Sequence, residues 1–310
     1  MQTIDYDLII IGAGPAGLTA GIYAARARLN ALLIEKVVPG GQVLVSDWIE
    51  NYPGFPEGIS GTDLVMKMSE QAQHFGIPIE SEEVTGLDLD GDVKKIHLGD
   101  RTLTTRAIII ATGASPNKLN VPGEDRFFGK GISSCATCDA PLYRDKVLAA
   151  VGGGDTAVQE AIFLTKFARK VYLIHRRKQF RATRILQERA LANDKIEILW
   201  DSMVTEIGGG FTNVEKVTVK NVKTGDIQDL PVDGCFIWVG IHPNAGFVGN
   251  ALEADENGFI ITDQQMQTSV PGVFAAGDVR KTPLRQIATS VGDAAIAVHT
   301  AEAYIESKKG

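Results

Sequence analysis

The sequence has few cysteines and no excess of positive charge, and each shortage excludes a class of protein. Only three cysteines occur in 310 residues, too few for the disulfide framework that stabilises small secreted proteins. Lys and Arg number 31 against 38 Asp and Glu, which gives a net charge of −7. Because nucleic-acid phosphates require a basic surface, the composition disfavours a nucleic-acid-binding protein.

A membrane segment and a secretory leader are also disfavoured. Residues 8–25 carry no charge over 18 residues, the length at which a membrane helix is considered. However, the stretch contains four glycines and Pro15, and no Lys or Arg precedes it, as a secretory signal would require. We therefore expect a cytoplasmic protein. Its length suggests two domains, each large enough to bury a core.

A strand–turn–helix–strand pattern occurs twice in the sequence. The first copy has an apolar run at residues 6–11, the turn GAGPAG at 12–17, a small-residue helix and a second run that ends at Glu35. The second copy starts 140 residues later with GGGDTA at residues 152–157 and ends at His175. In both, the polar residue that ends the second run lies 23 positions after the first glycine. One such match is weak evidence, but two in register predict an α/β fold with two Rossmann-like dinucleotide-binding domains.

A second internal similarity indicates the domain borders. Residues 107–117 and 234–244 each form an apolar run that ends in glycine and is followed by Pro-Asn. Strands that stop at Gly and Pro are places where a chain can leave one domain for another. We expect a first domain at residues 1–116 and 245–310, with a second domain inserted at 117–244.

The residues that end the second runs predict different ligands for the two turns. Glu35 can accept hydrogen bonds from ribose hydroxyls and repels a 2′-phosphate, which favours FAD or NAD; its alternative role is that of a surface acid at a strand end. Arg176 and Arg177 can bind a 2′-phosphate with charge-assisted hydrogen bonds, which favours NADPH; otherwise they form a solvated basic turn. Arg181 could add a third donor if this segment is helical.

The inserted domain contains the cysteine pair Cys135 and Cys138, spaced as C-x-x-C. This spacing allows a small disulfide that exchanges readily, whereas a zinc site would need further ligands that the neighbouring sequence lacks. Asp139 is either a solvated acid or a proton carrier for the thiols. Cys235 lies among apolar residues and is expected to be an inert core thiol. A disulfide accepts electrons from a nicotinamide efficiently only through an intermediary, so the pair favours FAD at the first turn.

These features together resemble one known family, the low-molecular-weight, bacterial-type thioredoxin reductases, over essentially the whole chain. The matching segments are residues 12–17, 40–42, 50–54, 111–114, 135–139, 152–155, 175–177, 277–278 and 285–286. The resemblance implies a homodimer that uses FAD and NADPH and passes electrons to thioredoxin through the Cys135–Cys138 disulfide.

The expected site residues follow from the motifs and from this resemblance. Those expected around FAD are Gly12, Gly14, Pro15, Ala16, Gly17, Glu35, Gly41, Gln42, Asn51, Thr112, Gly113, Asp278, Arg285, Gln286 and Ile287. Those expected around NADPH are Gly152, Gly154, Asp155, Thr156, His175, Arg176, Arg177 and Arg181. The expected catalytic residues are Cys135, Cys138 and Asp139, and no metal is expected.

Three other functions fit part of the pattern. The chain could reduce a different small disulfide protein, or it could be a flavin-dependent dithiol oxidase, although an oxidase needs no arginines after residue 174. It could also be a redox sensor that binds both nucleotides without turnover.

In the reductase, nicotinamide and disulfide would both have to reach one flavin from the inserted domain, so the Pro-Asn segments at 116–117 and 243–244 are expected to act as hinges.

Overall fold

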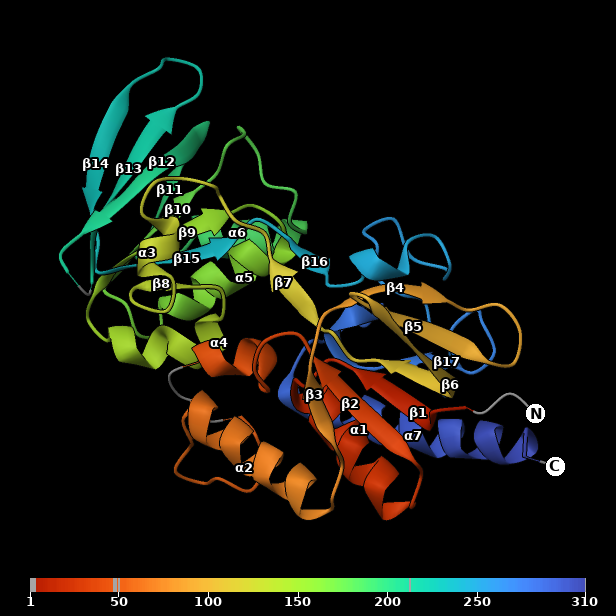
Figure 1. Ribbon diagram of the computed structural model, residues 1–310. Helices are drawn as coiled ribbons and strands as arrows, with labels where there is room; N and C mark the ends of the chain where they lie inside the picture. The colour runs from red at the N-terminus through yellow and green to blue at the C-terminus, as the bar shows by residue number, and fades with distance from the viewer. Residues whose placement is uncertain (1–3, 47–48, 50, 212, 310) are drawn as a thin grey trace. The chain divides into compact units, whose positions relative to one another are not determined.

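A computed structural model describes residues 4–46, 49, 51–211 and 213–309, with the backbone alone for Val45, Thr137 and Cys138. The chain forms two compact units, each with its own sheets and helices (Figure 1). Unit 1 falls within Met1–Val45, Ile49–Ser115 and His242–Gly310, and unit 2 falls within Ser46–Trp48 and Pro116–Ile241.

Unit 1 is built on a seven-stranded sheet of order β3-β2-β1-β6-β5-β4, with β17 also paired to β6. Its strands are β1 (Tyr6–Ile11), β2 (Ala31–Glu35), β3 (Ile79–Ser81), β4 (Val84–Asp88), β5 (Lys94–Leu98), β6 (Arg101–Ile110) and β17 (Val273–Ala275). The pairs of β1 with β2 and β6 are parallel, while β5 is antiparallel to β6. One edge of β6 serves two neighbours, because residues 101–105 pair with β5 and 108–110 pair with β17.

Alternating apolar side chains of these strands separate two cores in unit 1. In β1, Leu8 and Ile10 lie in the core shared with the helices, whereas Ile9 and Ile11 lie in the core on the other face. This is the period of two that a buried strand imposes. The helices of the unit are α1 (Pro15–Arg26), α2 (Gly61–His74) and α7 (Ile287–Ser307), with short 3-10 turns η1 (Gly41–Val45), η3 (Gly246–Val248) and η4 (Gly277–Val279). Helices α1 and α7, drawn in red and blue in Figure 1, pack against each other.

Unit 2 is built on a five-stranded sheet of order β11-β10-β9-β15-β8, in which every neighbouring pair is parallel. Its strands are β8 (Ile132–Ser133), β9 (Val147–Gly152), β10 (Lys170–Ile174), β11 (Ile196–Leu199) and β15 (Gly234–Trp238). Its helices are α3 (Glu124–Phe127), α4 (Ala136–Asp139), α5 (Asp155–Leu164) and α6 (Arg184–Leu191), with the 3-10 turn η2 (Ala140–Tyr143). The antiparallel strands β12 (Ser202–Gly209), β13 (Val214–Asn221) and β14 (Ile227–Pro231) add side chains to the core on one face.

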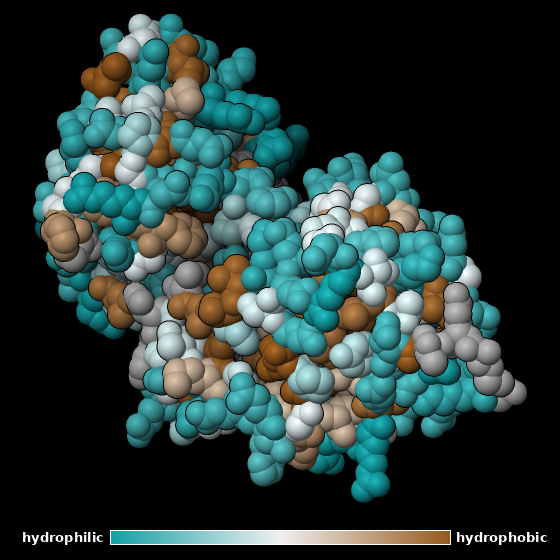
Figure 2. All heavy atoms as spheres, in the orientation of Figure 1, coloured by the Kyte–Doolittle hydropathy of each residue, from teal (hydrophilic) through white to brown (hydrophobic). Residues whose placement is uncertain are grey.

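The sequence-based prediction of two Rossmann-like halves in an α/β fold is confirmed by β1-α1-β2 and β9-α5-β10. Two short strands, β7 (Ala114–Pro116) and β16 (Ile241–Pro243), pair with each other where the chain leaves unit 1 and returns to it. Within the described residues, no helix combines the length and apolar character of a membrane span. Figure 2 shows hydrophilic residues over much of the visible surface, with hydrophobic residues interspersed.

Candidate functional site

The first glycine turn leaves β1 and opens α1, and two of its three glycines, Gly12 and Gly17, have no room for side chains. A Cβ on Gly12 would lie 2.6 Å from the carbonyl oxygen of Ala111, and a Cβ on Gly17 would overlap the carbonyl oxygen of Gly12. At Gly14, in contrast, the space is open. Gly14 is also the N-cap of α1, where no side chain accepts the free backbone amides. An anionic group can therefore approach these amides and the positive end of the helix dipole.

Glu35 lies beside this turn and is not a freely solvated acid. Its Oε2 accepts a hydrogen bond of 2.7 Å from the backbone amide of Ala13, and its Oε1 accepts one of 3.2 Å from that of Val37. The carboxylate is thus held at the end of β2, next to the phosphate-binding turn. There it can accept hydrogen bonds from ribose hydroxyls and repel a 2′-phosphate.

Segments far apart in the sequence meet around the turn within unit 1. A Cβ built on Gly41 lies 3.4 Å from the Cα of Gly14, and one built on Gly277 lies 3.1 Å from the Cβ of Ala16. The Asn51 side-chain amide donates a hydrogen bond of 2.9 Å to Gln286 Oε1, although 235 residues separate them. The other residues expected at FAD are placed as follows: Pro15 at the first position of α1, Gln42 exposed on η1, Thr112 bonded through Oγ1 to Asn244 O at 2.7 Å, Gly113 before β7, and Ile287 first in α7.

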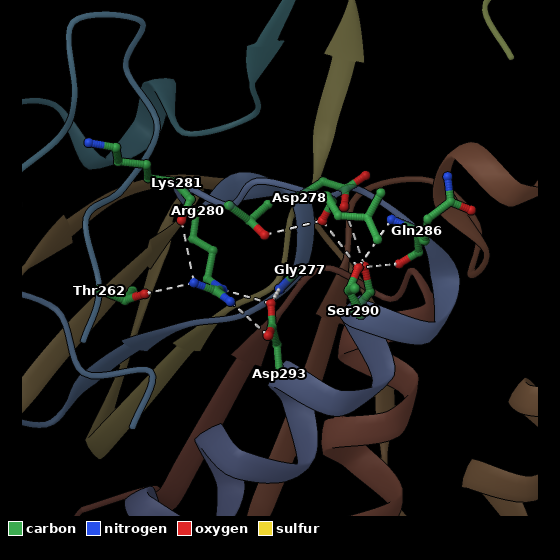
Figure 3. Close-up of polar contacts among 11 residues, drawn as sticks. Thr262, Gly277, Asp278, Arg280, Lys281, Gln286, Ser290 and Asp293 are labelled. Carbon is green, nitrogen blue, oxygen red and sulfur yellow. Dashed lines mark hydrogen bonds and ion pairs between the residues drawn. The ribbon is translucent and has the colours of Figure 1, made fainter. Parts of the chain in front are cut away.

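Asp278 is a partly buried acid of this site, on the short turn η4. Burial raises its pKa, while the nearby Arg285 guanidinium opposes that rise. The Ser290 hydroxyl donates a weak hydrogen bond of 3.4 Å to its Oδ1 (Figure 3). Arg285 stacks its guanidinium 4.1 Å above the Phe259 ring, and its buried Nε finds no hydrogen-bond acceptor among the described residues. A polar group of a ligand would satisfy this donor.

A second carboxylate, that of Asp293, supports the same turn from inside α7. Arg280 donates to it from Nε at 2.7 Å and from Nη2 at 2.8 Å, and the Gly277 amide donates at 3.1 Å (Figure 3). Both side chains of the ion pair are nearly buried, with 15% and 11% of their surface exposed. No sequence pattern indicates this pair, because Arg280 and Asp293 belong to no dinucleotide-binding motif.

The residues of unit 1 fit FAD. An open helix N-terminus suits a pyrophosphate, the fixed carboxylate of Glu35 suits a ribose, and the orphaned Arg285 Nε together with the Asn51 and Gln286 amides suits further polar groups. Since no 2′-phosphate could lie next to Glu35 without repulsion, NADPH is a poor fit here.

The second glycine turn, between β9 and α5, repeats the first. A Cβ on Gly152 would lie 2.5 Å from the Trp238 carbonyl oxygen, whereas the space at Gly154 is open. Gly154 is the N-cap of α5 and no side chain caps the helix. Asp155 and Thr156 are the first two residues of α5, and both are exposed. This turn also offers free amides to a pyrophosphate.

The arginine loop, residues 176–183, follows β10 and carries the exposed side chains of Arg176, Arg177 and Arg181. No ion pair involving these three arginines occurs within the part of the chain that the structure describes. Arg181 was expected to add a third donor if this segment were helical, but the loop is not helical and α6 begins only at Arg184. The Arg181 amide instead donates a hydrogen bond of 2.7 Å to Gly153 O, which ties the loop to the glycine turn.

His175 lies beneath the second turn and not on its surface. Its side chain is buried, burial lowers its pKa, and Nε2 lies 3.1 Å from the Gln179 carbonyl oxygen. A Cβ on Gly153 would overlap its ring. The ring belongs to an aromatic cluster with Phe180 and Trp200, whose own ring centroids are 4.4 Å apart. Phe180 and Trp200 could not be identified from the sequence, because no local motif marks them.

The cysteine segment also belongs to unit 2. Cys135 is the N-cap of α4 and is disulfide-bonded, while the side chain of Cys138 lies outside the described part of the structure. Asp139 is the last residue of α4 and is partly buried; its amide donates to Cys135 O at 3.2 Å. Cys235 is free and buried, and burial raises its pKa to about 12, so it is an inert thiol. Among the described residues, no cluster of His, Cys, Asp and Glu could hold a metal ion.

Comparison with known proteins agrees with this geometry. Residues 6–296 match the family described as pyridine nucleotide-disulphide oxidoreductase. A thioredoxin reductase of Listeria innocua is 45% identical over 306 residues, which cover 98% of this chain and 95% of that protein. One of Peptoclostridium litorale is 43% identical over 307 residues, with 97% of both chains covered.

Solved structures give the same answer. The crystal structure of thioredoxin reductase from Streptococcus pyogenes matches with a TM-score of 0.90 and 49% identity, over 97% of this chain and 98% of that one. The thioredoxin reductase from Giardia duodenalis matches with a TM-score of 0.88 and 37% identity, over 98% and 100%. The chain therefore belongs to the pyridine nucleotide-disulphide oxidoreductases and, among them, to the thioredoxin reductase family.

Proposed function

We propose that the protein is an NADPH-dependent thioredoxin reductase that passes electrons from NADPH through FAD and the Cys135–Cys138 disulfide to thioredoxin. The observation that carries the proposal is that unit 2 contains both a disulfide-bonded Cys135 and an arginine loop beside a glycine turn. The glutamate-ended turn of unit 1 supports a second, unlike nucleotide. The names of the similar proteins support thioredoxin as the substrate.

The two nucleotide sites have different tasks. In the domain formed by residues 1–116 and 245–310, the first turn, Glu35 and the residues around Asp278 hold FAD. In the domain formed by residues 117–244, the second turn and the arginine loop hold NADPH. When bound, FAD supplies the ability to accept a hydride from a nicotinamide and to pass the electron pair to a disulfide.

The cysteines then carry out thiol–disulfide exchange. After Cys135 and Cys138 have been reduced, the thiolate of one attacks a sulfur of the thioredoxin disulfide and forms a mixed disulfide. The second cysteine attacks its neighbour, restores the Cys135–Cys138 bond and releases thioredoxin as a dithiol. Asp139 accepts and returns the proton that each thiol must lose or gain, because only the thiolate is nucleophilic.

An anaerobic titration tests the proposal. The purified flavoprotein is titrated with NADPH while the flavin absorbance is followed, and oxidised thioredoxin is then added. We expect bleaching followed by reoxidation. Bleaching without reoxidation would refute thioredoxin as the substrate, and equal efficiency of NADH and NADPH would refute the role of the arginine loop.

Two variants assign the residues. Arg176→Ala combined with Arg177→Ala should raise the KM for NADPH far more than that for NADH, because only NADPH carries the 2′-phosphate. Cys138→Ser should keep a reducible flavin but lose disulfide reduction. Residual reduction close to wild type would remove the cysteine pair from the mechanism.

Assembly and location belong to the same proposal. We expect a homodimer in the cytoplasm, because the resemblance implies a dimer and the cysteine usage suits a reducing compartment. Light scattering coupled to gel filtration would detect the dimer as twice the 33.3 kDa chain mass.

A further inference from the structure

A carboxylate of the glycine turn also holds the arginine loop. Asp155 is the first residue of α5, and its Oδ1 accepts a hydrogen bond of 2.6 Å from the backbone amide of Thr183. Thr183 ends the loop and is the N-cap of α6, whose N-terminus receives no side-chain cap of its own. The bond thus joins the start of one helix to the start of another across 28 residues of sequence.

Among the described residues, this bond is one of two hydrogen bonds between the glycine turn and the arginine loop. The other is the hydrogen bond of 2.7 Å from the Arg181 amide to Gly153 O. Between these anchors, Ala182 is buried. The two links fix the backbone at Arg181 and at Thr183, in the C-terminal half of the loop, and so constrain where the exposed guanidinium groups of the loop stand relative to the turn.

A negatively charged side chain such as that of Asp155 is unexpected at a helix N-terminus that binds phosphates. A carboxylate in the first turn of a helix stabilises that helix, but it repels the phosphates that the same helix N-terminus is built to receive. A neutral residue would bind an anion better. The hydrogen bond to Thr183 is the contribution of Asp155 that a shorter neutral side chain could not make.

We propose that Asp155 is a positioning residue that determines nucleotide specificity. Through Thr183 it holds the arginine loop in register with the glycine turn, so that the guanidinium groups meet a 2′-phosphate when the turn holds the pyrophosphate. The inference rests on the proposed NADPH site and names a residue that sets its preference without contacting the 2′-phosphate.

Two substitutions separate the hydrogen bond from the charge. Asp155→Asn removes the charge but keeps an acceptor for the Thr183 amide, whereas Asp155→Ala removes both. Thr183→Pro removes the donor instead, at a residue whose φ of −57° already suits proline. Asp263→Ala is the matched control, because Asp263 caps an exposed turn of unit 1 through the amides of Gln265 and Gln267.

The readout is binding of two probes to the FAD-loaded protein, measured by calorimetry. Adenosine 2′,5′-bisphosphate and adenosine 5′-monophosphate differ only in the 2′-phosphate, so the ratio of their Kd values reports the arginine loop alone. We expect Asp155→Asn and Asp263→Ala to keep the wild-type ratio. Asp155→Ala and Thr183→Pro should each reduce the ratio about fivefold, the factor that corresponds to the roughly 1 kcal/mol that one capping hydrogen bond contributes to stability. Because both substitutions remove the same hydrogen bond, the double variant Asp155→Ala, Thr183→Pro should reduce the Kd ratio no further than either single variant.

The outcomes separate this inference from the proposed function. If Asp155→Ala weakens both probes equally, or if Asp155→Asn behaves like Asp155→Ala, the positioning role is refuted while a wild-type preference for the bisphosphate still supports NADPH. If the wild-type protein itself binds both probes equally, the NADPH assignment fails.

Discussion

The ion pair between Arg280 and Asp293 predicts a large loss of stability from a single substitution. Asp293→Ala removes the acceptor of two guanidinium hydrogen bonds, at 2.7 and 2.8 Å, and of the Gly277 amide. Among the described residues, Arg280 would keep only weak hydrogen bonds, of 3.3 Å to Thr262 and 3.4 Å to the Lys281 carbonyl (Figure 3). Leaving a nearly buried charge without its partner costs about 3–5 kcal/mol. For a unit of this size we expect the Tm to fall by roughly 6–20 °C.

The loss should reach the flavin site, because Gly277 begins the turn that carries Asp278. The assay is thermal unfolding of the purified flavoprotein, followed both by circular dichroism and by the rise in flavin fluorescence on FAD release. Asp92→Ala is the control, since Asp92 pairs with Lys308 at the surface, with 74% of its side chain exposed. The control should leave both transitions unchanged.

A double variant tests the reasoning itself. Arg280→Met combined with Asp293→Ala leaves no unpaired buried charge, so it should be more stable than Asp293→Ala alone. A Tm shift below about 2 °C for Asp293→Ala, or a double variant as unstable as the sum of the singles, would refute the argument.

Three further predictions concern unit 2. Gly153→Ala should lower the Tm and weaken NADPH binding because its methyl group would overlap the His175 ring; wild-type values for both would show that the ring can move. Since burial lowers the pKa of His175, the unfolded chain takes up a proton more readily than the folded one. Stability should therefore fall as the pH drops through about 6.5, and His175→Gln should flatten this part of the Tm–pH profile; parallel profiles would contradict the assignment. In the oxidised native protein no thiol should react with Ellman's reagent, because Cys135 is disulfide-bonded and Cys235 is buried with a pKa raised to about 12; rapid labelling before denaturation would show that the thiol is accessible.

The nucleotide-binding turns were predictable because their signal is local. Glycines at fixed intervals between an apolar run and a helix report a backbone that must approach a neighbour closely, and Gly12 and Gly152 are both crowded by other backbone atoms. The polar residue at the end of the next strand is equally local, so Glu35 could be placed beside its turn before any contact was known.

The contacts that support these turns were not predictable, because their two halves lie far apart in the sequence and each half looks ordinary alone. Asp155 and Thr183, or His175 and Trp200, become partners only once the sheet has formed. The three-stranded sheet β12-β13-β14 was also missed, since its strands carry no dinucleotide-binding motif. The small-residue pattern predicts a first helix that ends at about Arg28, whereas α1 ends at Arg26, which is the usual error of a boundary.

The place of β17 and α7 in unit 1 has a consequence for biosynthesis. The sheet of this unit lacks β17 until residue 275 has been made, and the core around α1 lacks α7 until residue 307. All strands and helices of unit 2 are complete at residue 238. During translation, every helix and strand of unit 2 is therefore complete before β17 and α7, with which the first 115 residues pack, have been made. Unit 2 is expected to fold first during translation, and an isolated 117–241 fragment should fold by itself.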